Sequence, residues 1–238
     1  MPNILLTGAS RGIGAAIAAA LDRPGVALAG HATGAGPAFL TAHLAADFAE
    51  PAAPAALWRA ALDRLGSIDV LVNNAGIFEA NPIDASDADW QAAWARTMQV
   101  NLAAAADLCR LAVLHWQARG VPGRVVNVAS RAAYRGDSPA HWHYAASKAG
   151  MVAMTKTIAR GYARDGILAF AVCPGFTMTG MAEDYVESRG GDRLLADIPL
   201  GRVAEPDEVA AAVRFLALEA PASMTGAVID INGASYVR

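Results

Sequence analysis

The chain has 238 residues, of which 55% are hydrophobic and 17% charged, and its formal net charge at pH 7 is −3. This length and apolar content predict a single α/β domain, residues 1–238, with a large buried core. A negative net charge gives no sign of a basic surface for binding nucleic acid. No apolar run reaches the ~18 residues that a membrane helix needs, and no signal peptide is visible. We therefore expect a cytoplasmic protein without a nucleic-acid or membrane partner.

Short apolar runs alternate with longer segments of helical periodicity along the chain. This alternation predicts a single-domain Rossmann fold, a doubly wound parallel sheet of about seven strands with helices on both faces. The predicted strands are Asn3–Thr7, Val26–His31, Leu44–Ala46, Val70–Asn73, Arg124–Ala129, Ile167–Cys173 and Ala227–Ile231. The predicted helices are Ile13–Leu21, Ala53–Leu65, Asp87–Arg119, Tyr144–Arg164 and Asp207–Leu218.

Several helix ends are signalled by individual residues. Ser86 followed by Asp89 resembles a capping box, and Pro206 suits the first position of a helix. Gly66 and Gly120 stand where helices should stop. Two cysteines far apart in apolar runs indicate buried thiols in a reducing compartment.

A glycine-rich segment, Thr7–Gly14, joins the first predicted strand to the first predicted helix. Glycines there let backbone amides approach a pyrophosphate, which then rests on the positive end of the helix. The spacing is GxxxGxG and not the commoner GxGxxG, and a plain turn is the competing interpretation. The candidate cofactor-binding residues in this segment are Gly8, Ser10, Arg11, Gly12, Ile13 and Gly14.

Tyr144 and Lys148 are four residues apart on a predicted helix, which places them on one face. A positive charge beside a phenol favours the phenolate and lowers the pKa of the tyrosine. Such a phenol can exchange a proton with an alcohol or carbonyl oxygen near neutral pH. For an isolated pair of this kind, a structural aromatic and a solvated lysine would be the better interpretation. The other motifs decide against it.

The motifs together resemble the short-chain dehydrogenase/reductase family, within it the 3-oxoacyl-[acyl-carrier-protein] reductase-like subgroup. The resemblance covers nearly the whole chain, and the ordered set is far more specific than any one motif. In chain order the matching segments are Thr7–Gly14, Asn73–Gly76, Asn101, Ser130, Tyr144 with Lys148, and Pro174–Thr179.

The resemblance implies catalytic roles for Tyr144, Lys148, Ser130 and Asn101. Tyr144 would be the general acid in reduction and the base in oxidation. Lys148 would lower its pKa and bind the nicotinamide ribose. Ser130 would hold the substrate oxygen. Asn101 would anchor a water relay to the lysine.

The resemblance also implies where the rest of the cofactor binds. The turn after the fourth strand would lie beside the adenosine, and Asp47 would accept a hydrogen bond from the adenine amino group, unless it is simply an exposed loop residue. The residues that complete this site are Asn74, Ala75, Gly76, Pro174, Gly175, Thr177 and Thr179.

The end of the second strand bears on the choice of cofactor. NAD-dependent folds place an acid there for the ribose 2′-hydroxyl, and this chain has none. Arg11 could pair with a 2′-phosphate, and His31 and Thr33 could add hydrogen bonds. NADP(H) is therefore favoured, while NAD(H) stays possible.

The substrate side is less informative. Residues 131–143 should flank the substrate, with aromatic side chains either lining it or packing elsewhere. His141 and His143 lack nearby cysteine or carboxylate ligands, so no metal site is predicted. A polar segment, 179–199, is expected to form a substrate-covering loop. Recognition of an acidic acyl-carrier protein would need a basic patch, and the candidates are Arg131, Arg135, Arg189 and Arg193. They are mixed with Glu183, Asp184, Glu187 and Asp192, so this recognition is unsupported.

The leading hypothesis is an NADP-dependent oxidoreductase that interconverts a carbonyl and a secondary alcohol, most simply a ketoreductase acting on a small-molecule substrate. One alternative is an NAD-dependent sugar or polyol dehydrogenase, and another is a non-catalytic nucleotide-binding regulator. The family resemblance implies a homotetramer. The substrate, its stereochemistry and the physiological direction stay open.

Overall fold

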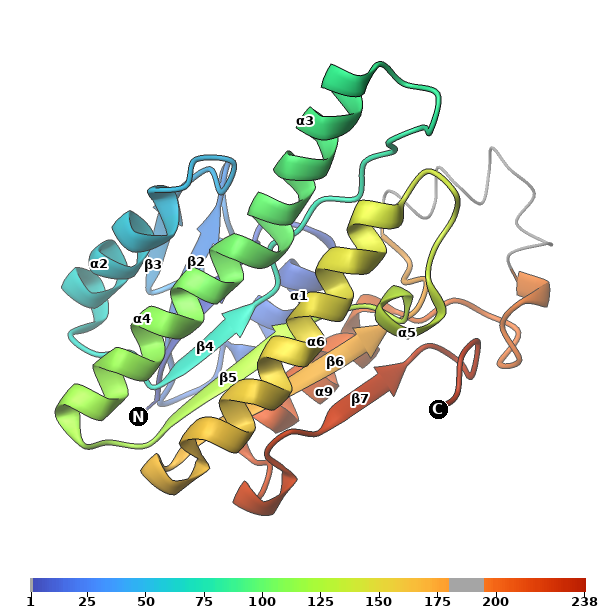
Figure 1. Ribbon diagram of the computed structural model, residues 1–238. Helices are drawn as coiled ribbons and strands as arrows, with labels where there is room; N and C mark the ends of the chain where they lie inside the picture. The colour runs from blue at the N-terminus through green and yellow to red at the C-terminus, as the bar shows by residue number, and fades with distance from the viewer. Residues whose placement is uncertain (1, 180–194) are drawn as a thin grey trace.

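The computed structural model describes residues 2–179 and 195–238. Strands and helices alternate through most of this length (Figure 1). The strands are β1 (Asn3–Thr7), β2 (Ala27–Ala32), β3 (Ala42–Ala45), β4 (Val70–Asn73), β5 (Gly123–Val128), β6 (Ile167–Pro174) and β7 (Val228–Ile231). The main helices are α1 (Gly12–Leu21), α2 (Ala53–Leu65), α3 (Asp87–Met98), α4 (Ala104–Arg119), α5 (Ala132–Arg135), α6 (Trp142–Tyr162) and α9 (Pro206–Leu218). Most of the predicted substrate-covering loop, 179–199, lies outside the described residues.

Within the described ranges, seven parallel strands form one sheet in the order β3-β2-β1-β4-β5-β6-β7. Leu5 in β1 pairs with Ala29 on one side and Leu71 on the other. The sheet therefore grows in opposite directions from the neighbouring strands β1 and β4, which places a topological switch point between them. The predicted doubly wound fold is confirmed.

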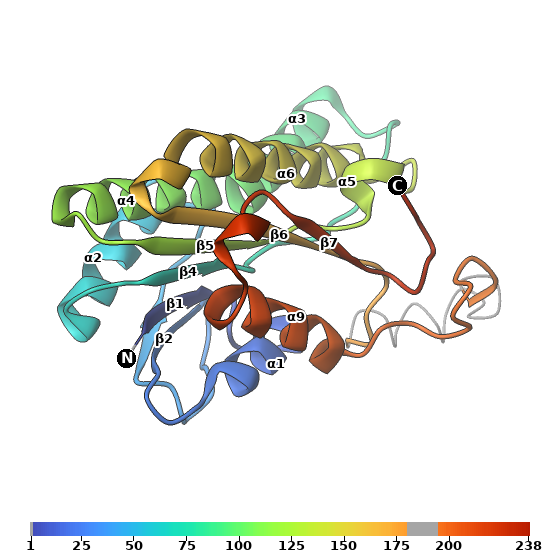
Figure 2. The same ribbon diagram turned by 90° about the horizontal axis from the view of Figure 1, so that it is seen from below.

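The helices lie in two layers, with α4 and α6 on one face of the sheet and α1 and α9 on the other (Figure 2). Side chains alternate between these layers along each strand. Leu5 and Val125 belong to the cluster under α2, α4 and α6, whereas Leu6 and Val126 belong to the cluster over α1 and α9. Burial of both strand faces explains why the strands are apolar throughout and show no polar alternation.

The predicted helix Asp87–Arg119 is interrupted by a π-helical turn, η1 (Gln99–Ala103), between α3 and α4. In this turn the Ala104 amide donates to the Gln99 carbonyl, five residues back. The wider turn inserts one extra residue and so changes the direction in which Asn101 points. Apolar periodicity carried no signal for this turn.

The predicted helix ends are confirmed by the backbone. Ser86 accepts a hydrogen bond from the Asp89 amide at 3.2 Å, and Pro206 occupies the first turn of α9. Gly66 and Gly120 end α2 and α4 with φ of +74° and +61°. Side-chain-bearing residues rarely adopt these angles, which explains why glycine stops these helices.

Both cysteines, Cys109 and Cys173, are buried free thiols, as the sequence predicts. Burial raises the pKa of Cys109 to about 12 and that of Cys173 to about 11. Across the described ranges, no helix combines the length and apolarity that crossing a bilayer requires.

Gly123→Ala should destabilise the fold, because a Cβ there would lie 2.0 Å from the Trp116 ring. Trp116 cannot move freely, since it is fully buried and donates from Nε1 to the Ile68 carbonyl at 2.7 Å. We expect a loss of about 1–3 kcal/mol in the free energy of unfolding, measured by urea denaturation. Gly161→Ala is the matched control: it lies within α6 with open space around it, and should raise stability by about 0.5–1 kcal/mol. Equal effects of the two changes would contradict the packing described here.

Candidate active site

The predicted motif residues gather at the carboxyl edge of the sheet. The glycine turn follows β1, the Asn74–Gly76 turn follows β4, Ser130 follows β5, and the Pro174–Thr179 segment follows β6. Open α/β sheets bind their ligands at this edge, beside the switch point. Residues from four distant parts of the sequence are thereby brought to one edge of the sheet.

The glycine turn is closed around backbone atoms. Gly8 has a φ of +70°, and a Cβ on it would lie 2.8 Å from the Ala75 Cα. A Cβ on Gly14 would lie only 1.8 Å from the Gly8 carbonyl oxygen. Neither position can hold a side chain without moving the backbone, so both glycines are required for the shape of the turn.

Hydrogen bonds tie this turn to the one after β4. Asn74 donates from Nδ2 to the carbonyl oxygens of Thr7, at 3.1 Å, and Gly8, at 3.0 Å. The Thr7 hydroxyl oxygen in turn accepts from the amides of Asn74 and Ala75, each at 3.0 Å. Asn74 thus acts as a structural clamp on the glycine turn. The sequence did not indicate this role, because asparagine is common in turns for other reasons.

The start of α1 fits a phosphate group. Its first turn carries no acidic residue, and the Arg11 side chain makes no cap to its amides. The free amides at this end of the helix, together with the helix dipole, can therefore bind an anion. Ser10 and Arg11 are exposed at the same place, and Ile13 lies in the first turn. These residues fit the pyrophosphate of a dinucleotide.

His31 does not have the expected role of binding a 2′-phosphate. Its ring is 3% exposed and stacks on Phe48, with ring centroids 4.3 Å apart. Nδ1 accepts from the Gly8 amide at 3.4 Å, and Nε2 lies 3.1 Å from the Ala46 carbonyl oxygen. Burial lowers the pKa of His31, consistent with a neutral ring that supports the glycine turn from below.

The other two residues expected near the adenosine are at the surface. Thr33 is exposed just beyond β2, and Asp47 is exposed just beyond β3. Asp47 accepts from the Ala49 amide at 2.9 Å, which fixes its carboxylate in a turn. Both positions are open to a ligand at the carboxyl edge.

Tyr144 and Lys148 lie on one face of α6, as their spacing predicts. The Lys148 Nζ is 5.8 Å from the centre of the Tyr144 ring. The same Nζ donates to the Val128 carbonyl at 2.9 Å, which fixes the lysine against the end of β5. Ser130, two residues further along, is buried and accepts at Oγ from the Ala132 amide at 3.1 Å.

The pKa of Tyr144 differs from the expectation. Burial raises the pKa of Tyr144 to about 12, and the neighbouring Ser130 side chain offsets only part of this rise. Lys148 is itself buried, and burial lowers its pKa to about 8. The lysine therefore does not make the phenol more acidic in the protein alone: desolvation outweighs the charge that the sequence argument relied on.

Asn101 lies in the π-helical turn η1 with its amide turned to the Asn74–Gly76 segment. Its Oδ1 accepts from the Ile77 amide at 2.8 Å, and its Nδ2 donates to the Ile77 carbonyl at 2.9 Å. A Cβ on Gly76 would lie 3.3 Å from this Oδ1 and 3.5 Å from the Lys148 Nζ. Gly76 thus leaves room for Asn101 and Lys148 to come together.

The segment after β6 closes the other side of the site. The Gly175 amide donates to the Ile231 carbonyl at 2.9 Å, and a Cβ on Gly175 would lie 2.8 Å from that of Asn232. Thr177 is buried and donates to the Gly175 carbonyl at 3.3 Å. The Thr179 methyl would lie 3.1 Å from a Cβ on Gly12, so this segment reaches the glycine turn.

Comparison with known proteins agrees with this geometry. A family model described as enoyl-(acyl carrier protein) reductase matches residues 8–234. A 3-oxoacyl-[acyl-carrier-protein] reductase of Vibrio cholerae is 35% identical, over 98% of this chain and 96% of its own. The chain belongs to the short-chain dehydrogenase/reductase family. The chain is an oxidoreductase of this family, and the resemblance drawn from the motifs is confirmed.

Other relatives in the family differ in their named substrates. An acetoacetyl-CoA reductase of Rhizobium meliloti is 33% identical, over 98% of this chain and 97% of its own. A solved structure described as a 2-deoxy-D-gluconate 3-dehydrogenase of Agrobacterium tumefaciens, with bound NADP, has a TM-score of 0.87. It is 30% identical and covers 100% of this chain and 97% of that one. The family is thus clear, whereas the relatives leave the substrate open.

One aromatic ring packs against the phenol of this family member. Phe78 stacks on His141 with ring centroids 3.9 Å apart and meets Tyr144 edge-on at 4.7 Å. Of the rings expected at residues 131–143, His141 therefore lies beside the site, whereas Tyr134 stacks on Tyr236 and Trp142 is exposed. Sequence reasoning missed Phe78, although its place two residues after Gly76 could have suggested it. His143 is buried against Trp94, and within residues 2–179 and 195–238 no group of three potential ligands for a metal ion occurs.

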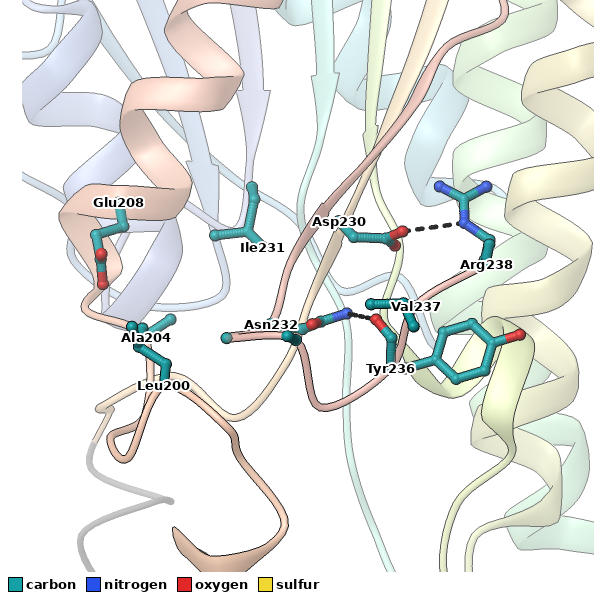
Figure 3. A pocket seen from close by; sticks show the side chains of 11 residues that line it. Leu200, Ala204, Glu208, Asp230, Ile231, Asn232, Tyr236, Val237 and Arg238 are labelled. Carbon is teal, nitrogen blue, oxygen red and sulfur yellow. Dashed lines mark hydrogen bonds and ion pairs between the residues drawn. The ribbon is translucent and has the colours of Figure 1, made fainter.

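A separate hollow of about 630 Å³ lies beside β7 and is lined by none of the predicted catalytic residues (Figure 3). Asp230 pairs with Arg238 at 3.0 Å there, and Asn232 donates to the Tyr236 carbonyl at 3.0 Å. This hollow adjoins the segment after β6 through Asn232, which backs Gly175, and through Ile231 and Ala204, which form backbone hydrogen bonds to that segment.

Proposed function

We propose that this protein is an NADP(H)-dependent ketoreductase, which interconverts a carbonyl and a secondary alcohol by hydride transfer. The observation that carries the proposal is the meeting of Tyr144, Lys148 and Ser130 beside a glycine turn built for a dinucleotide. Neither half of this arrangement is specific by itself. Together they provide a proton donor and a place for a hydride carrier within one site.

The roles of the side chains follow from their positions. The nicotinamide cofactor, when bound, supplies or accepts the hydride. Tyr144 donates its phenolic proton to the substrate oxygen in reduction, while the Ser130 hydroxyl donates a hydrogen bond to the same oxygen as its charge develops. Lys148, held by the Val128 carbonyl, places a positive charge beside the phenol when protonated. Asn101 holds the Ile77 backbone and so positions the adjoining turn.

The pKa of Tyr144 supports its role as the proton donor in reduction at neutral pH. With the pKa of Tyr144 at about 12, the phenol is protonated and ready to donate. Oxidation of an alcohol would first require the phenolate, which is costly in a buried site. Before the cofactor binds, Tyr144 is therefore in the protonated form that carbonyl reduction requires and not in the phenolate form that alcohol oxidation requires.

The preference for NADP(H) rests on charge near the end of β2. Neither β2 nor residues 33–46 after it contain an acid that could bind a ribose 2′-hydroxyl. The exposed Arg11 lies in the glycine turn. The Agrobacterium relative binds NADP, which agrees with this preference. Since His31 is buried, Arg11 and Thr33 are the candidates for the 2′-phosphate.

An NAD-dependent sugar or polyol dehydrogenase is the second candidate. The same catalytic residues could run it, and the Agrobacterium relative carries the name of a sugar-acid dehydrogenase. A non-catalytic regulator is disfavoured because the chain keeps Tyr144, Lys148, Ser130 and Asn101 together. The homotetramer implied by the family stays a prediction.

Tyr144→Phe should remove nearly all turnover, because phenylalanine has no proton to give. We expect kcat to fall at least about a hundredfold, with NADPH affinity changed by less than about threefold. Steady-state rates over a panel of ketones and fluorescence titration of NADPH would measure the two effects. Turnover like that of the wild type would refute the assignment of the acid.

Arg11→Ala should weaken NADPH binding much more than NADH binding, since only NADPH carries the 2′-phosphate. Loss of one charge-assisted contact predicts about a tenfold or greater increase in the Kd for NADPH. Arg23→Ala removes an exposed arginine beyond the end of α1 and is the matched control. If Arg11→Ala weakened both cofactors equally, the assignment of NADP(H) to this arginine would be wrong.

A further inference from the structure

Arg131 directly follows the predicted catalytic Ser130 and is 8% exposed. Arginine is almost never so deeply buried unless it is paired with a carboxylate or another anion. The proposed proton transfer gives this residue no part. Its surroundings therefore decide what the buried charge is for.

The guanidinium of Arg131 is held against the segment after β6. Its Cζ lies 4.6 Å from the centre of the Phe176 ring, a cation–π contact. The Arg131 amide donates to the Pro174 carbonyl at 2.9 Å, which anchors the backbone at the same edge. Phe176 stands between Gly175 and Thr177, the residues proposed to lie along the cofactor. The charge is thus held beside the Gly175–Thr177 segment.

The positive charge of Arg131 is only partly balanced. Asp197 lies 3.7 Å from the Arg131 Nη1 but only 2.6 Å from the Nη1 of Arg135, which donates to it. Among the residues that the structure describes, the buried Arg131 Nη1 has no hydrogen-bond partner. Asp137, the other nearby carboxylate, is exposed and forms no ion pair within those residues.

The pKa of Arg131 agrees with this incomplete pairing. Burial and the neighbouring Arg135 lower the pKa of Arg131, and Asp197 and Asp137 act in the opposite direction. Within residues 2–179 and 195–238, the two arginines share one carboxylate, that of Asp197. A buried N–H donor that carries charge and lacks an acceptor is costly, and an anion in the site would remove that cost.

We propose that Arg131 binds a carboxylate of the substrate, so that the enzyme prefers short keto acids over neutral ketones. This inference rests on the proposed function. Arginine binds carboxylates through paired N–H groups, and the approach of Asp197 shows that the guanidinium can be reached by such a group. Arg131 directly follows Ser130 and contacts Phe176, so the proposed carboxylate site adjoins the segment that we expect to line the cofactor.

A purely structural role makes a different prediction. Arg131 and Arg135 could simply hold Asp197, and with it residues 195–198, against α5. In that case Arg131→Gln and Asp197→Asn would harm acidic and neutral substrates alike. If Arg131 binds the substrate, removing Asp197 frees the guanidinium and the preference for an acid persists or grows.

Acetoacetate and methyl acetoacetate form a matched pair for this test, because they differ in the carboxylate alone. The ratio of their kcat/KM values with NADPH should favour the acid in the wild type. Arg131→Gln should lower this ratio at least about thirtyfold, mainly through the KM of the acid. Asp197→Asn should not lower it. Arg119→Gln, which removes an exposed charge at the end of α4, is the control for net charge and should leave the ratio unchanged.

The proposal is overturned if the wild type shows no preference for the acid, or if Arg131→Gln and Asp197→Asn lower both rates equally. Failure of the proposed function has a different signature, namely no turnover of either compound. If neither compound is turned over, calorimetric titration of acetoacetate into the protein with NADPH still tests whether Arg131 binds the carboxylate. Binding that Arg131→Gln abolishes would support the carboxylate site, and no binding to the wild type would refute it.

Discussion

The clamp between β1 and β4 is the constraint on which the rest of the site depends. Asn74 donates to the carbonyls of Thr7 and Gly8, while the Thr7 hydroxyl accepts from the amides that follow β4. These bonds join the strands at the switch point, where parallel strands diverge and leave their ends open. Without them the glycine turn would lack a fixed shape. His31 also supports the glycine turn, because its Nδ1 accepts a hydrogen bond from the Gly8 amide.

The clamp also connects the dinucleotide turn to the catalytic helix. From Asn74 the chain reaches Gly76, whose missing side chain admits both the Asn101 amide and the Lys148 ammonium. Asn101 then fixes the Ile77 backbone from the π-helical turn between α3 and α4. A short run of backbone thus contacts the glycine turn at one end and the side chains of Asn101 and Lys148 at the other.

Much of this could be predicted from the sequence, and the misses share a physical cause. The strands were visible because both of their faces are buried, and Gly66 and Gly120 marked helix ends because other residues rarely adopt their backbone angles. The role of His31 and the raised pKa of Tyr144 were not visible, because each depends on burial by distant segments. The π-helical turn and the aromatic contact of Phe78 were likewise set by packing. Local spacing predicts which residues lie close together, whereas burial by distant segments determines their pKa values and their contacts.

The central claim is that a buried, protonated Tyr144 gives the protein its activity as a reductase. Initial rates of ketone reduction and alcohol oxidation, measured from about pH 6 to 10, test it most directly. We predict a steady reduction rate near neutral pH that declines as Lys148, with a pKa of about 8, loses its charge. Oxidation should keep rising across the range, because the phenol, with a pKa of about 12, must give up its proton first. An oxidation rate that peaks near pH 7 would contradict this account.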